Sequence, residues 1–272
     1  MVFNTPDRIA DLTPDNPFDR LPDGRPAISD DLLARARLVS PEEAWSVLNR
    51  RHGYQFQFEG GWHVLHPDRV LVGRVVTAVF MPLRPDLDKV VMNWGKARGW
   101  SPRQNTWVID NLVKDDVVVV DLFGKLRDGT FAGDNLATAI KTRTGTGMVV
   151  DGGIRDARQI EELDGFNAFV RGIDPSAIAE VTLVGVNVPV RIGGATVLPG
   201  DLVLGTSAGV TFIPPALVEE IILHSEETRL RDEFGKQRLS EGRYTSSQID
   251  TQSWEPEIQT DYLAWKERRT RG

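Results

Sequence analysis

Three runs of β-branched and other apolar residues, separated by helix-forming segments, constrain the fold of this chain more than any other feature. The runs are VLVGRVVTAVFM (70–81), VVVVDLF (117–123) and GMVVDGG (147–153). Their length and composition are typical of buried strands, whereas Leu136, Ala139 and Ile140 repeat at the spacing of one helix face. Several short strands with Gly and Pro turns are expected within 181–215. This order of elements predicts an α/β protein with a mixed sheet.

The segments outside these runs suggest how the chain is divided. Residues 1–28 are rich in Pro and Asp and are expected to form an N-terminal arm. Ser40, Pro41 and Glu43 have the pattern of a capping box that begins a helix. A long helix is expected from Pro214 or Pro215 to near Gly235 or Gly242. We therefore expect one domain over 29–235 and a C-terminal extension over 236–272.

Composition excludes several classes of function. The 272 residues carry a formal net charge of −7, so the chain lacks the basic footprint of a nucleic-acid-binding protein. It has no cysteine, which removes disulfides, thiolate metal ligands and cysteine nucleophiles. The first twenty residues lack the apolar core of a signal peptide, and no apolar run approaches the ~18 residues of a membrane helix. We expect a cytoplasmic protein without membrane or nucleic-acid partners, in which local positive groups hold any anionic small molecule.

The tripeptide Gly133-Asp134-Asn135 lies between the second strand run and the following helix. The first backbone N–H groups of a helix have no partner within the helix, so they favour a bound carboxylate or phosphate. Gly133 would let the backbone approach such a ligand closely. The alternative is that Asp134 or Asn135 is an ordinary N-cap without a ligand.

A second group of polar residues follows the third strand run. Gly152 and Gly153 precede Arg155 and Asp156. Ligands of open α/β sheets gather beyond the carboxyl ends of the strands, and adjacent parallel strands would place these residues beside Gly133-Asp134. The alternative is that Arg155 and Asp156 form a surface ion pair or another helix cap.

Twenty residues separate Asp134 from Arg155, and Asp156 follows directly. In this spacing the chain resembles the HMG/CHA aldolase family of class II pyruvate aldolases. These enzymes share their fold with proteins described as regulators of ribonuclease E activity A. The resemblance extends over roughly residues 36–230 and includes GMVVDGGIRDARQI and the PGD, GV and IP segments of residues 199–214.

The resemblance implies a compact α/β/β sandwich that forms homotrimers or homohexamers with sites at subunit interfaces. It implies a divalent metal, Mg²⁺ or Mn²⁺, held by Asp156 largely through water. It implies that Arg155 faces the 2-oxo oxygen of the substrate. The loop at Gly133, with the amides around Asp134, Asn135 and Leu136, would bind the substrate carboxylate, and Asp134 would position or activate a water.

The function expected from this resemblance is that of a metal-dependent lyase acting on a 2-oxo acid or a sugar-derived hydroxy acid. A metal and a guanidinium are suited to stabilise the enolate that forms beside a 2-oxo acid. The reaction expected first is aldol cleavage, which releases pyruvate or a related 2-oxo acid. Decarboxylation of oxaloacetate-like acids and dehydration pass through the same enolate and remain alternatives. A non-enzymatic regulator that binds an endoribonuclease is the alternative from another class. A methyltransferase is not favoured, because no strand leads into a convincing glycine-rich cofactor loop.

This chain departs from the family in a few places. Thr206, Ser207 and Ala208 stand where many members carry acids, so any role of those acids is lost. Basic side chains of an added segment could reach the substrate, namely Arg84, Lys89, Lys96 and Arg98. An acid from the late helix of a neighbouring subunit could join the site; the candidates are Glu219, Glu220, Glu226, Glu227 and Asp232. Four further residues carry only weak signals as ligands or as Schiff-base lysines: His63, His66, Lys125 and Lys141.

Overall fold

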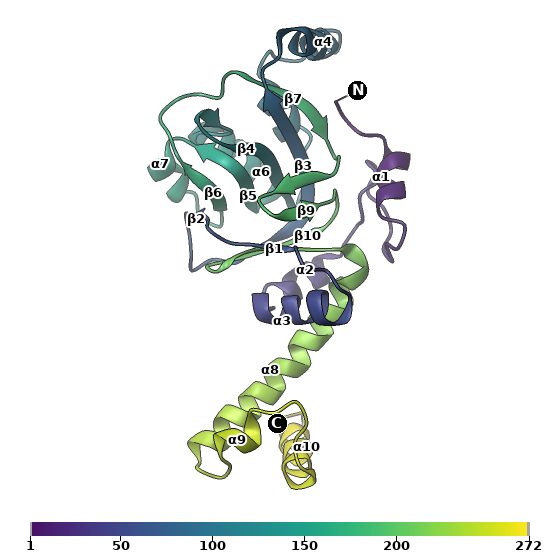
Figure 1. The fold of residues 1–272 in the computed structure, drawn as a ribbon, viewed down its shortest axis with the longest axis vertical. Coiled ribbons are helices and arrows are strands. Elements are labelled where there is room, and N and C mark those ends of the chain that lie inside the picture. The colour runs from purple at the N-terminus through teal and green to yellow at the C-terminus, as the bar shows by residue number, and fades with distance from the viewer. Residues whose placement is uncertain (1, 271–272) are drawn as a thin grey trace.

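The computed structural model describes residues 2–270 and contains a mixed sheet of nine strands (Figure 1). Its centre is parallel, because helices or long connections return the chain to the same edge between successive strands. The parallel strands lie side by side in chain order: β3 (Leu71–Pro82), β4 (Asp116–Thr130), β5 (Gly147–Ile154) and β6 (Asn167–Ile173).

Antiparallel strands extend both edges of this centre. β10 and β11 form a hairpin that joins β3, β1 pairs with β11, β2 pairs with β6, and β7 pairs with the later part of β3. β8 and β9 form a separate hairpin. The bounds are β1 (Phe58–Glu59), β2 (His63–Val64), β7 (Val181–Val186), β8 (Val190–Ile192), β9 (Ala195–Val197), β10 (Leu202–Thr206) and β11 (Gly209–Ile213). The predicted mixed α/β architecture is confirmed.

Alternate residues of the central strands face two different layers. Val118 and Val120 of β4 belong to the core that includes residues of the helices, whereas Val117 and Val119 pack with residues of the β8–β9 hairpin. This two-residue period explains why a continuous valine run is buried on both sides. The helices of the first core are α4 (Pro85–Lys96), α5 (Gln104–Ile109), α6 (Asp134–Thr144) and α7 (Ala157–Glu161). The resulting order of helix, sheet and hairpin agrees with the expected α/β/β sandwich.

The N-terminal arm is anchored to the domain by a buried ion pair. The guanidinium of Arg25 donates from Nη1 and Nη2 to the two carboxylate oxygens of Asp116, at 2.8 and 3.1 Å. The capping box of Ser40 and Glu43 is present as predicted. The arm also contains a short helix that the irregular composition did not predict. The helix of the arm is α1 (Pro6–Leu12). The segment that follows the arm contains α2 (Asp30–Ala36), α3 (Pro41–Trp45) and the π-helical turn η1 (Ser46–Arg51).

The C-terminal part projects from the sheet as a long helix followed by a turn back (Figure 1). The long helix continues through Gly235 and ends at Ser240, so Gly242 is the better of the two expected stops. Phe234 packs there against Trp254, Tyr262 and Trp265. The domain boundary expected at residue 235 thus falls inside a helix. The elements are η2 (Pro215–Leu217), α8 (Val218–Ser240), α9 (Ser246–Ile249) and α10 (Pro256–Thr270). Among residues 2–270, none of the helices has the length and apolar character needed to span a bilayer.

Candidate functional site

The two polar groups singled out in the sequence lie side by side. β4 and β5 are adjacent and parallel, so the loop after β4 and the residues after β5 emerge at the same edge of the sheet. The backbone N–H of Arg155 donates to the carbonyl oxygen of Ala132 at 3.1 Å, which continues the contact between strands beyond their ends. The expectation that adjacent parallel strands bring Gly133-Asp134 and Arg155-Asp156 together is therefore confirmed.

Gly133 is in close contact with both residues of the Arg155-Asp156 pair. A β-carbon placed on Gly133 would lie 2.4 Å from Oδ2 of Asp156 and 2.9 Å from Nε of Arg155. The φ angle of Gly133 is −109°, which any residue adopts. A β-carbon at this position would require these two partly exposed side chains to shift.

The start of α6 is not capped by a side chain. Gly133 occupies the N-cap position, and Asp134 and Asn135 are the first two residues of the helix. Oδ1 of Asp134 accepts the N–H of Asn135 at 2.7 Å. The alternative that Asp134 or Asn135 serves as an ordinary N-cap is therefore wrong, because the cap position lies one residue earlier. The positive end of the helix dipole is left facing the adjoining cavity.

Arg155 and Asp156 form a loose, partly exposed ion pair. Nε of Arg155 lies 3.6 Å from Oδ2 of Asp156, and the two side chains are 44% and 37% exposed. Asp156 precedes α7 with a φ of +55°, a left-handed conformation that is uncommon for a residue other than glycine. Its side chain makes no capping hydrogen bond to α7. The carboxylate is thus held beside Gly133 while solvent and small ions can still reach it.

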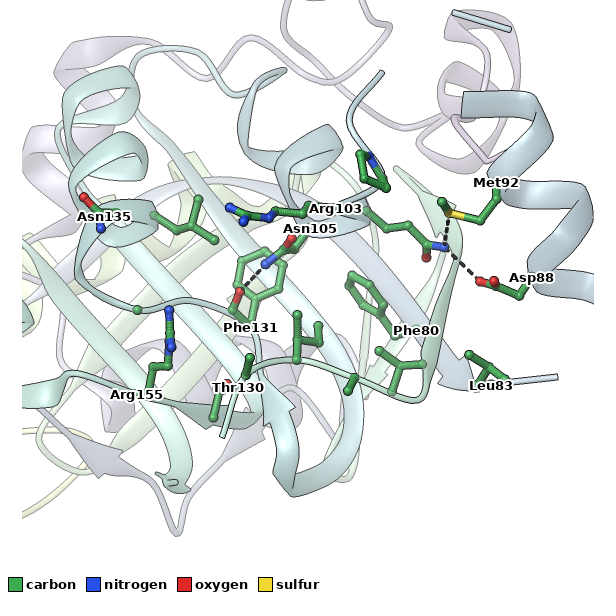
Figure 2. A pocket seen from close by; sticks show the side chains of 18 of the residues that line it. Phe80, Leu83, Asp88, Met92, Arg103, Asn105, Thr130, Phe131, Asn135 and Arg155 are labelled. Carbon is green, nitrogen blue, oxygen red and sulfur yellow. Dashed lines mark hydrogen bonds between the residues drawn. The ribbon is translucent and has the colours of Figure 1, made fainter. Parts of the chain in front are cut away.

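A cavity of about 520 Å³ opens at the start of α6 (Figure 2). Arg155 and the first turn of α6 line one part of it, and the added segment between β3 and β4 lines another. The site residues expected from the sequence that line it are Gly133, Asp134, Asn135, Leu136 and Arg155. Asp156, whose Oδ2 lies beside Gly133, is not among the residues that line the cavity. A volume of this size can enclose a small organic molecule.

The basic residue that the added segment contributes to the cavity is Arg103, which the sequence analysis did not single out. Arg103 lies in the connection between α4 and α5, and in Figure 2 its guanidinium points toward the α6 end. The four basic residues proposed for this role do not line the cavity. Arg84 instead pairs with Asp86, and the guanidinium of Arg98 stacks on Trp94. No sequence signal distinguished these residues, because the path of the connection over the cavity depends on tertiary packing.

The other side chains that the sequence offered as possible ligands or catalytic groups lie outside the cavity. His63, His66, Lys125 and Lys141 are absent from the lining of the cavity. Among the late-helix acids, Glu220 pairs with Arg51 and His52, Glu226 with Arg35, and Glu227 with Lys266. These acids lie on α8, outside the cavity of their own chain.

The donors near Asp156 fit one type of metal binding. Within residues 2–270 there is no group of three His, Cys, Asp or Glu residues arranged to hold a metal ion. Mg²⁺ and Mn²⁺ accept oxygen ligands, and Mg²⁺ keeps several waters, so one partly exposed carboxylate can suffice. The site fits a divalent cation bound by Asp156 and water, and it does not fit a cage made of protein ligands.

The start of α6, Arg155 and Asp156 thus lie together at the carboxyl edge of the parallel strands, where the ligands of open α/β sheets gather. The sequence profile of the RraA-like family, described as Aldolase/RraA, matches residues 26–212. The chain belongs to this family.

Individual relatives agree with this assignment. A protein of Halalkalibacterium halodurans named "Putative 4-hydroxy-4-methyl-2-oxoglutarate aldolase" is 35% identical over 126 residues, which are 46% of this chain and 59% of that protein. The match thus spans less than two thirds of that relative. The solved structure of RraAS2 from Streptomyces coelicolor, described as an unusual member of the RNase ES inhibitor RraA protein family, has a TM-score of 0.65 and 28% identity. That comparison covers 77% of this chain and 98% of RraAS2.

A further solved structure shows the same fold without informing function. An uncharacterized protein from Pseudomonas syringae pv. tomato has a TM-score of 0.65 at 22% identity, over 86% of this chain and 96% of its own. The matched share is larger than for RraAS2, which indicates that the fold similarity extends over most of the chain.

Proposed function

We propose that this protein is a metal-dependent lyase that breaks a bond beside a 2-oxo acid through an enolate intermediate. The observation that carries the proposal is the convergence of three features on one place. The first turn of α6 and Arg155 line the same cavity, and Asp156 contacts the glycine that joins them. The helix N-terminus and the arginine both favour a negatively charged ligand.

Each residue has a role that follows from its position. The backbone N–H groups of Asp134 and Leu136 at the start of α6 would hold the substrate carboxylate, since the N–H of Asn135 already bonds Oδ1 of Asp134. Arg155 would donate to the 2-oxo oxygen, where negative charge develops in the transition state. Asp156, which lies beside Gly133 and outside the cavity wall, would hold a divalent cation through water, and when bound that cation would supply a Lewis acid.

Aldol cleavage is the reaction we propose first. A water held by Asp134 would accept the proton of the 4-hydroxyl group, the bond between C3 and C4 would break, and its electron pair would form the enolate on C2. A proton returned to C3 would then give pyruvate or a related 2-oxo acid, while C4 leaves as a carbonyl product. Oδ1 of Asp134 already accepts the N–H of Asn135, which orients the carboxylate and leaves Oδ2 for the water.

The test is a panel of 4-hydroxy-2-oxo acids and oxaloacetate assayed with Mg²⁺, with a chelator, and in the Arg155→Ala and Asp156→Ala variants. We expect turnover in the parent protein and a loss of roughly 100- to 1,000-fold in Arg155→Ala. Arg158→Ala removes an exposed arginine of α7 outside the cavity and should have no effect. Pyruvate with a carbonyl product identifies aldol cleavage, CO₂ identifies decarboxylation, and loss of water identifies dehydration. Turnover that survives both variants would contradict the proposal.

The similarity to RraAS2 supports a second candidate, a regulator that binds an endoribonuclease. This function needs neither the cation nor Arg155. Retention of an endoribonuclease by the purified protein, unchanged in Arg155→Ala and accompanied by no turnover of any acid, would favour it. For either function we propose a homotrimer or homohexamer, which sedimentation of the full chain would test.

A further inference from the structure

The cavity is longer than the proposed chemistry requires. Figure 2 shows Asn135 and Arg155 near one end and Leu83, Asp88 and Met92 near the other, with Phe131 between them. The carboxylate and 2-oxo group of a substrate would occupy only the end at α6. The remainder of the cavity must therefore enclose the part of the substrate that lies beyond the bond to be broken.

The end remote from α6 has apolar walls. Phe80 and Leu83 come from β3 and the turn after it, and Met92 comes from α4. These three side chains, which lie on the side of Phe131 remote from Asn135 in Figure 2, are named here the apolar end. Both basic residues of the lining, Arg103 and Arg155, lie on the α6 side of Phe80 in Figure 2. No cation among the lining residues is therefore placed to pair with a negative group at the apolar end.

The polar side chains beside the apolar end are already engaged within the protein. Oδ1 of Asp88 accepts from Nε2 of Gln104 at 3.0 Å and from Oγ1 of Thr182 at 2.9 Å. Oε1 of Gln104 accepts the backbone N–H of Leu183 at 2.5 Å. A polyhydroxy chain would find Oδ2 of Asp88 as the acceptor that these bonds leave open, and a second carboxylate would be repelled by the Asp88 carboxylate. Either group would make fewer hydrogen bonds at this end than it makes in water.

We propose that the substrate is a 2-oxo acid whose remote end is an alkyl or aryl group held in the apolar end. This inference rests on the proposed lyase function and adds the substrate class. It favours apolar substituents over both a second carboxylate and a sugar chain. The added segment between β3 and β4, which supplies Leu83, Met92 and Arg103, is then the part of this chain that determines specificity.

Binding of three unreactive acids with the same head group tests the inference. Oxamate carries the carboxylate and the adjacent oxygen, N-benzyloxamate adds an apolar tail, and N-(carboxymethyl)oxamate adds a charged tail. Calorimetry of the full chain with Mg²⁺ should show N-benzyloxamate binding roughly ten- to a hundredfold more tightly than N-(carboxymethyl)oxamate. All three should bind more weakly to Arg155→Ala, because they share the head group.

A matched pair of variants tests whether the preference for an apolar tail arises at the apolar end. Leu83 and Val90 are both 45% exposed, but only Leu83 lines the cavity. Leu83→Lys should weaken the binding of N-benzyloxamate, strengthen the binding of N-(carboxymethyl)oxamate and leave the affinity for oxamate unchanged. Val90→Lys should change none of the three affinities. Met92→Lys provides a second variant at the apolar end with the same expected direction.

The outcomes separate this inference from the proposed function. Oxamate binding that depends on Arg155, together with equal or tighter binding of N-(carboxymethyl)oxamate than of N-benzyloxamate, would overturn the inference and leave the lyase proposal standing. A preference for N-benzyloxamate that Leu83→Lys and Met92→Lys both leave unchanged would also overturn it. Failure of all three acids to bind the folded, Mg²⁺-loaded protein would overturn both.

Discussion

Gly133 and Asp156 are so close that a β-carbon on Gly133 would lie 2.4 Å from the carboxylate oxygen Oδ2. Twenty-two residues of sequence separate them, and the parallel pairing of β4 with β5 brings them together. This contact joins the start of α6, where we place the substrate carboxylate, to the residue where we place the cation. The geometry of the proposed site therefore depends on the absence of a side chain at position 133.

Gly133→Ala should lower turnover by about 100-fold, because the added methyl group would push Asp156 and Arg155 away from the start of α6. Gly60→Ala is a suitable control, since a β-carbon there meets no atom closer than 3.7 Å. Steady-state kinetics measures the turnover of both variants, and thermal unfolding shows whether they remain folded. Activity in Gly133→Ala equal to that of the parent would show that the contact is dispensable.

Asp156→Asn should weaken Mn²⁺ binding by about tenfold or more, because a neutral amide replaces the carboxylate that we propose as the single protein ligand. Electron paramagnetic resonance of free Mn²⁺ measures the affinity without any assay of activity. Glu161→Gln removes one negative charge from an exposed position of α7 and serves as the matched control. Equal Mn²⁺ affinity in both variants would place the cation elsewhere.

The buried Asp201 should make stability depend on pH. Its side chain is 2% exposed, and burial raises the pKa of the carboxyl from an ordinary 3.8 to about 7. Between these two pH values the folded protein retains a proton that the unfolded chain has released. The contribution of Asp201 to the free energy of unfolding therefore falls as pH rises from about 4 to about 7, and is constant above that range.

Asp201→Asn removes this dependence, and above pH 7 the variant should be more stable than the parent by about 2–4 kcal/mol. The amide oxygen of the new side chain can still accept the N–H of Leu198, which Oδ2 of Asp201 accepts at 2.8 Å. Urea unfolding at pH 5 and pH 8 measures the difference, with Asp15→Asn at an exposed position as the control. A stability difference that does not change between the two pH values would contradict the assignment.

Arg25→Ala should destabilise the protein by about 3–5 kcal/mol, because it leaves the buried carboxylate of Asp116 with only the N–H of Val113 and the more distant Nε of Arg74. Arg25 and Asp116 are 1% and 0% exposed. The double variant Arg25→Leu/Asp116→Asn should recover part of the loss, since it removes both charges. Chemical unfolding of the parent, the single variant and the double variant gives the comparison. A double variant less stable than Arg25→Ala would indicate that packing of the arm, and not the unpaired charge, causes the loss.

Much of the fold was predictable because its signals are local. The valine runs of β4 and β5 are long and apolar enough to indicate buried strands, and the capping box of Ser40 and Glu43 specifies the start of a helix within four residues. Asp134 and Asn135 were only the alternative N-cap candidates of α6, proposed because Asp and Asn are common caps and glycine gives a weaker signal, and the cap is Gly133. Arg103 was missed because a connection between two helices has no periodicity from which its direction can be read.

By itself, the sequence determined the apolar strand runs of a mixed sheet, the spacing from Asp134 to Arg155 and Asp156, and the absence of cysteine chemistry. Residue type and short-range spacing are enough for these properties. The tertiary structure alone decided that Gly133 contacts Asp156, that Arg103 and not Arg98 lines the cavity, and that the cavity has an apolar end. Those properties arise from β4–β5 pairing and from the packing of α4 and β7 around the cavity, which join residues distant in the chain.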